Sequence, residues 1–98
     1  MTILEQVYEQ LKQDKPELSK RTFSTEYLGA SSGYMTAMAY YNRDVSLKAL
    51  ANLRSTLATE AAAWREIDAT HNTERSKRNY QKALQLHSMA TETLLEAF

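Results

Sequence analysis

The chain has 98 residues, with 12 lysines and arginines against 12 aspartates and glutamates, so its formal net charge at pH 7 is zero. This length suits one domain with a modest core, and the absence of cysteine excludes disulfides and thiolate metal sites. Two glycines, one proline and no apolar run of about 18 residues favour a nearly all-helical cytoplasmic protein that does not enter a membrane.

The first helix is predicted over about residues 3–14. Thr2 and Glu5 form a capping-box pattern, in which each side chain satisfies a backbone amide at the helix start. Pro16 is expected to end the helix or to begin a new turn. One face of the helix is apolar and consists of Ile3, Leu4, Val7, Tyr8 and Leu11.

A second, short helix is predicted to begin at Ser24. This residue is a good N-cap, and Phe23 before it and Leu28 four residues after it have the spacing of a hydrophobic staple. Gly29 is expected to end this helix, because glycine enters the left-handed region at little cost.

Two further helices are predicted downstream. Ser31 is expected to cap a helix that runs to about Asn42, with Met35 and Met38 pointing inward. Ser46 is expected to cap the next one. Its core-facing stripe is formed by Leu47, Leu50, Leu53 and Leu57.

The last third of the chain, about residues 59–97, is expected to form a C-terminal helical hairpin. Thr59 and Glu60 either lie inside a continuing helix or cap a fresh one, and Thr73 is a plausible cap for the last helix. Since the rest of the chain cannot easily cover all of the apolar groups, we expect a homodimer; a monomer with intramolecular packing is the alternative.

The segment from Tyr27 to Met35, YLGASSGYM, resembles the turn of lambda-repressor/Cro-like (XRE-type) helix-turn-helix domains and of small uncharacterised bacterial proteins with the same Tyr-Leu-Gly pattern. The segment Ser46-Leu47-x-x-Leu50-x-x-Leu53 resembles the helix that follows in that family. The resemblance implies an all-α, lambda-repressor-like bundle of about five helices in a single domain, 1–98. In it, the helix-turn-helix core spans about 22–58 and the C-terminal helices about 59–97.

The resemblance also implies a DNA-binding transcriptional regulator with double-stranded DNA as its partner and Ser31–Asn42 as the recognition helix. The positions that match base-contacting positions of the family, Ser31, Ser32, Thr36 and Ala37, are small, which reduces discrimination between bases, whereas Arg43 matches a position where the family often has a cation that contacts the DNA backbone. The candidate DNA-binding residues are Thr25, Ser31, Ser32, Gly33, Thr36, Ala37, Tyr40 and Arg43.

Charge gives mixed support to DNA binding. Residues 31–58 hold three basic residues against one acidic residue, but the chain as a whole is neutral, and cations supply most of the non-specific affinity for DNA. An alternative is a protein-interaction module, such as an adaptor or antirepressor, that presents Tyr34, Tyr40 and Tyr41, or the C-terminal hairpin, to another protein. DNA binding predicts that the basic side chains gather on one face, whereas an interaction module predicts mixed charge around an exposed apolar patch.

No catalysis, metal or cofactor is expected. Asp68 and His71 have the spacing of half a carboxylate-bridged metal site, but Leu84 stands three residues before the other histidine, His87. The densest basic run, residues 75–78 with Lys82, is either a solvated helix face or a contact to flanking phosphates.

Overall fold

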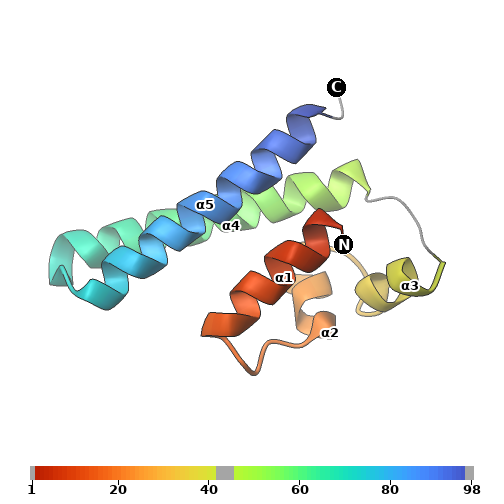
Figure 1. The fold of residues 1–98 in the computed structure, drawn as a ribbon, viewed down its shortest axis with the longest axis horizontal. Coiled ribbons are helices and arrows are strands. Elements are labelled where there is room, and N and C mark those ends of the chain that lie inside the picture. Colours follow the sequence, from red (N-terminus) through yellow and green to blue (C-terminus); the bar gives the residue numbers. More distant parts are fainter. Residues whose placement is uncertain (1, 42–45, 97–98) are drawn as a thin grey trace.

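The computed structural model describes residues 2–41 and 46–96, and the side chains of Tyr40 and Tyr41 lie outside this description. Figure 1 shows how the helices are arranged in space. Within the described ranges the chain is all helical, which confirms the predicted class of an all-α bundle of about five helices. The helices are α1 (Ile3–Asp14), α2 (Lys20–Thr22) continued by the π-helical turn η1 (Phe23–Tyr27), α3 (Tyr34–Tyr41), α4 (Leu47–His71) and α5 (Glu74–Glu96).

Helix α1 forms as the sequence predicts. The Thr2 hydroxyl accepts a hydrogen bond from the Glu5 amide at 3.2 Å, and so caps the helix. Leu4, Val7, Tyr8 and Leu11 are buried on its inner face. The Tyr8 hydroxyl donates to the carbonyl of Leu18 at 3.0 Å, which holds the connection after Pro16 against α1.

The second helix begins earlier than predicted, because Ser19 is its cap. The Ser19 hydroxyl accepts from the Thr22 amide at 3.1 Å, and the helix then continues through η1 to Tyr27. Ser24 lies inside this helix, fully buried, and its hydroxyl donates to the Lys20 carbonyl. The prediction of Ser24 as an N-cap was therefore wrong: a serine in a helix interior can satisfy its hydroxyl on the carbonyl four residues before it.

The turn between η1 and α3 confirms the prediction for Gly29, whose φ of +59° lies in the left-handed region. Helix α3 begins at Tyr34, two residues later than a cap at Ser31 predicts. Ser31 contributes its carbonyl, which accepts from the Tyr34 amide, and the first α-helical bond runs from the Ala37 amide to the Gly33 carbonyl. The predicted C-terminal residue of this helix, Asn42, lies outside the described residues.

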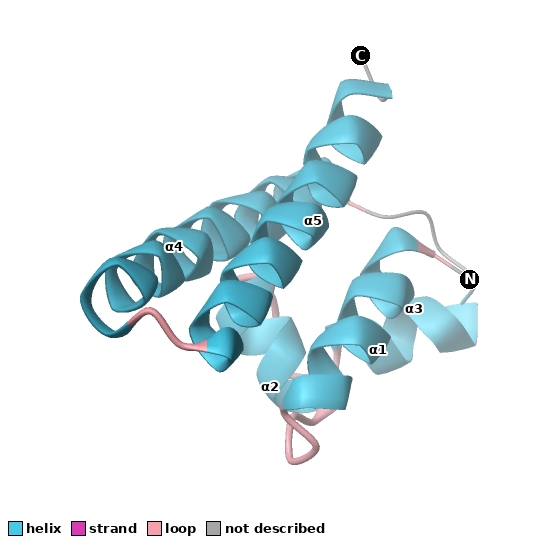
Figure 2. Ribbon diagram, turned by 60° about the vertical axis from the view of Figure 1, so that its left-hand side comes forward, coloured by secondary structure: helices cyan, strands magenta, loops and turns pink. Residues whose placement is uncertain are grey.

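Helices α4 and α5 form the predicted antiparallel hairpin, which both ribbon views show (Figures 1 and 2). Ser46 caps α4 through the Ala49 amide, and Thr73 caps α5 through the Ser76 amide, both as predicted. Helix α4 is continuous from Leu47 to His71, so no fresh helix begins at Thr59.

One hydrophobic core joins the N-terminal helices to the hairpin. Phe23 is fully buried and packs between the rings of Tyr8 and Tyr27, with centroid distances of 5.4 and 5.3 Å. The hairpin contributes Leu50, Leu53, Leu57, Leu86 and Ala90. Leu47, which was predicted to face the core, is 48% exposed because it is the first residue of α4. No helix in the described ranges is both long enough and apolar enough to cross a membrane.

Candidate nucleic-acid interface

Ser24 joins the two helices on either side of the Gly29 turn. Its buried hydroxyl accepts from the Met35 amide at 3.2 Å, and its carbonyl accepts from the Ala30 amide at 3.0 Å. The Met35 amide belongs to the first turn of α3, where amides have no partner within the helix. A side chain of the preceding helix therefore satisfies one of these free amides and fixes the position of α3.

Helix α4 supports the same turn from behind. The Asn52 side-chain amide donates to the Leu28 carbonyl at 3.0 Å, and the Thr56 hydroxyl lies 3.3 Å from the Tyr27 carbonyl. Both carbonyls lie at the end of η1, where helical partners are missing. The Tyr34 hydroxyl accepts from the Ser46 amide at 3.2 Å, so Tyr34 links α3 to the start of α4.

The sequence-predicted site residues lie mostly on the surface of η1, the turn at Gly29 and α3. Ala37 is half-buried, and the Thr25 hydroxyl bonds to the carbonyls of Arg21 and Thr22. The Tyr40 side chain and all of Arg43 lie outside the described residues. The exposed members of the predicted set are Thr25, Ser31, Ser32, Gly33 and Thr36.

Three cations flank this surface, and the described part of the chain gives them no ion pair. Lys20 and Arg21 lie at the start of α2, and Lys48 lies in the first turn of α4; all three are exposed. The ion pairs among the described residues join Lys15 to Glu60 and Lys82 to Asp14. Glu17, shortly before α2, and Glu26 of η1 are also exposed, so acidic and basic side chains both lie along this segment.

A polar cluster of Lys15, Tyr27 and Glu60 was missed by the sequence analysis. The Lys15 ammonium donates to the Tyr27 hydroxyl at 2.8 Å and to Glu60 at 3.1 Å, and the Tyr27 hydroxyl also donates to Glu60. Burial and the hydrogen bond to Glu60 raise the pKa of Tyr27 to about 12. Burial alone lowers the pKa of Lys15, but its bond to Tyr27 and the charge of Glu60 raise it overall.

The basic run of α5 lies far from α3. Figure 1 places the turn between α4 and α5, from which this run starts, at the end of the hairpin opposite α3. Arg75, Arg78 and Lys82 line a pocket of about 340 Å³ together with residues of α1 and α4. Ser76 within the run is buried, and its hydroxyl donates to the Asp68 carboxylate at 2.9 Å, so Asp68 helps to hold the turn.

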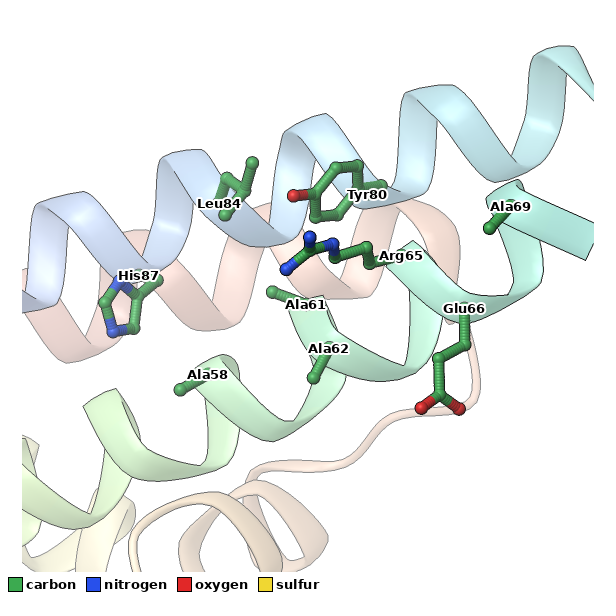
Figure 3. A pocket seen from close by; sticks show the side chains of 9 residues that line it. All are labelled: Ala58, Ala61, Ala62, Arg65, Glu66, Ala69, Tyr80, Leu84 and His87. Atoms are coloured by element: carbon green, nitrogen blue, oxygen red, sulfur yellow. The ribbon is translucent and has the colours of Figure 1, made fainter. Parts of the chain in front are cut away.

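An open groove of about 500 Å³ runs between α4 and α5 (Figure 3). Its α4 side is lined by four alanines together with Arg65 and Glu66, and its α5 side by Tyr80, Leu84 and His87. Leu84, which the sequence pattern placed in the apolar stripe of the last helix, is 42% exposed. Arg65 extends toward Tyr80, whereas Glu66 points away from α5. The groove therefore combines an exposed apolar surface with charges of both signs.

Comparison with known proteins identifies the family. The model of one family, described as "Family of unknown function (DUF6626)", matches residues 4–97, so the chain belongs to this family. No curated protein and no solved structure matches the chain.

Proposed function

We propose that this DUF6626 member binds double-stranded DNA and regulates transcription through the helix-turn-helix of α2–η1 and α3. The observation that supports this most strongly is the buried, hydrogen-bonded junction at Ser24. It fixes α3 on the preceding helix while the outward side chains around the start of α3 stay exposed. A groove-reading helix needs both features, a fixed orientation and an unobstructed face.

The exposed surface offers chemistry for both parts of a duplex. Lys20, Arg21 and Lys48 are exposed and have no ion pair among the described residues, so they are suited to meet phosphates, which fix the position of a protein on DNA. Ser31, Ser32 and Thr36 offer hydroxyls to base edges. Hydroxyls donate and accept alike, and therefore discriminate weakly between bases. The proposal is accordingly a regulator whose affinity depends strongly on salt and whose base selectivity is modest.

The test is to measure, by fluorescence anisotropy, how the affinity for mixed-sequence duplex DNA changes with salt concentration. Each phosphate contact contributes about 0.9 to the slope of log affinity against log salt. K20Q/R21Q should therefore flatten the slope by about 1.8. R75Q/R78Q is the matched control, because it removes two cations at the far end of the molecule.

Binding lost equally in both double variants would mean that net charge, and not the α2–α3 surface, determines affinity. No binding near about 50 mM salt at tens of micromolar protein, an order-of-magnitude window, would remove the proposal.

The second candidate is a protein-interaction module without DNA binding, and the groove in Figure 3 favours it. Exposed Leu84 and the mixed charges of Arg65 and Glu66 are the pattern expected of such a surface.

A homodimer would use the same groove. Arg65 and Glu66 have opposite charges and no partner among the described residues, so a two-fold axis could pair each with the other in a second copy. The molecular mass in solution distinguishes a homodimer, in which a second copy covers the groove, from a monomer, in which the groove is open to another protein.

A further inference from the structure

The pocket beside the basic run of α5 has the size of a small-molecule site. It encloses about 340 Å³ between the end of α1, the middle of α4 and the first half of α5, within the range of about 300–1,000 Å³ typical of ligand pockets. Its walls come from three helices, of which α1 is distant in the sequence from α4 and α5. Its lining therefore cannot be recognised as a motif.

The charges that line this pocket do not cancel. Four cations face two carboxylates, and each carboxylate already has a partner: Asp14 is paired with Lys82 at 2.9 Å, and Glu60 with Lys15 at 3.1 Å. Arg75 and Arg78 remain without an ion pair among the described residues. They stand three residues apart on α5 and so share one face. The pocket therefore has two guanidinium groups available for an anion from outside.

The remaining lining includes two amide side chains, Gln13 and Asn79, and one aromatic ring, which favours a planar body on that anion. Trp64 is half-buried at the pocket, and Leu11, Ala83 and Leu86 are buried beside it. The partly exposed indole ring offers a surface against which an aromatic ring can pack, and a guanidinium fork binds a carboxylate through two parallel hydrogen bonds.

We propose that this pocket binds a small aromatic carboxylate, with Arg75 and Arg78 bonding the carboxylate and Trp64 packing against the ring. Guanidinium groups also bind the phosphates of nucleic acids. The concave shape and the partly exposed ring of Trp64 favour a small molecule instead, since a phosphate group has no ring to pack against the indole. The site shares no residue with the proposed DNA surface, and its two arginines stand in the first turns of α5, beside the α4–α5 turn that lies at the end of the hairpin opposite α3.

The test follows the indole N–H resonance of Trp64 in ¹⁵N-labelled protein, a single signal because the chain has one tryptophan. The probes are 1-naphthoate, its neutral amide 1-naphthamide, and inorganic phosphate. Naphthoate should shift the indole signal until the site is saturated. The amide lacks the charge and phosphate lacks the ring, so each should bind at least about tenfold more weakly than naphthoate. Equal binding of naphthoate and its amide would overturn the proposal, as would no shift at all.

Two double variants complete the design. R75Q/R78Q should weaken naphthoate binding at least about tenfold, since it removes both forks. K20Q/R21Q removes the same charge elsewhere and should leave it unchanged within about twofold, the small effect expected of distant screened charges. Unchanged binding in R75Q/R78Q would overturn the proposal, as would a Trp64 response to single-stranded nucleic acid stronger than that to naphthoate. If K20Q/R21Q loses DNA binding but still binds naphthoate, the pocket proposal is unaffected. The failure of one proposal can therefore be told apart from the failure of the other.

Discussion

Replacement of Gly29 by alanine tests how the turn before α3 is held. With φ at +59°, Gly29 lies where an alanine costs about 1–2 kcal/mol. A Cβ there would also lie 2.8 Å from the side-chain nitrogen of Asn52. The Asn52 amide can move away, but it then gives up its 3.0 Å bond to the Leu28 carbonyl, a loss of about 0.5–1.5 kcal/mol. We therefore expect G29A to lower the free energy of unfolding by about 1.5–3.5 kcal/mol.

Gly33 provides the matched control. A Cβ at Gly33 would meet no heavy atom within 4 Å, and its φ is not in the left-handed region. G33A should therefore be neutral or stabilising by up to about 1 kcal/mol, because alanine restricts the unfolded chain more than glycine does. Urea unfolding followed by circular dichroism at 222 nm measures both variants. Equal stabilities of G29A and G33A would refute the explanation from backbone conformation.

A double variant separates the two parts of the Gly29 effect. N52A alone removes the bond to Leu28 and should cost about 0.5–1.5 kcal/mol. In the G29A background this bond is already lost, so N52A should cost less there, by an interaction energy of at least about 0.5 kcal/mol. If the stability losses of G29A and N52A simply add, the new Cβ does not displace the Asn52 side chain.

Three further outcomes are expected. S24A should destabilise the chain by about 1–3 kcal/mol in urea unfolding, because it leaves the Met35 amide unsatisfied in a buried position. A loss of stability below about 0.5 kcal/mol would mean that this amide finds another hydrogen-bond partner. The raised pKa of Tyr27 favours its neutral form in the folded chain, so this contribution to stability is complete below pH 10 and declines as the pH rises toward 12. Urea midpoints across this range should fall more steeply in the wild-type chain than in Y27F, and parallel curves would contradict the shift. T36A should change the preference among duplex sequences without changing the salt slope, since Thr36 is exposed on α3 and carries no charge. Fluorescence anisotropy on a panel of duplexes measures both quantities. A changed slope with unchanged preference would contradict the assignment of Thr36 to base edges.

The features that the sequence predicted correctly depend on local chemistry. Thr2, Ser46 and Thr73 each cap a helix through an amide three residues ahead, and Gly29 adopts the one conformation that favours glycine. These interactions need only neighbouring residues, so spacing in the sequence identifies them. The hairpin followed from the same kind of signal, an apolar repeat interrupted before Thr73.

The errors occurred where a residue has two local possibilities that tertiary contacts decide. Ser24 has the spacing of an N-cap, but the Met35 amide and the Lys20 carbonyl make it a buried helix residue. The cluster of Lys15, Tyr27 and Glu60 was missed because its members are 12 to 45 residues apart and meet only when α1, η1 and α4 pack together. The pocket at Arg75 and Arg78 was not predicted for the same reason: the sequence indicates a basic run, but not the walls that α1 and α4 place opposite it.

The most direct test of the central proposal is to map which amides respond when ¹⁵N-labelled protein is titrated with a mixed-sequence duplex near about 50 mM salt. DNA binding through the α2–α3 surface predicts that the largest shifts fall on Lys20, Arg21 and Thr25 and on residues 31–36, with little change at residues 75–82. Shifts confined to residues 75–82, or to the α4–α5 groove, would contradict the proposal and assign the interaction to the hairpin.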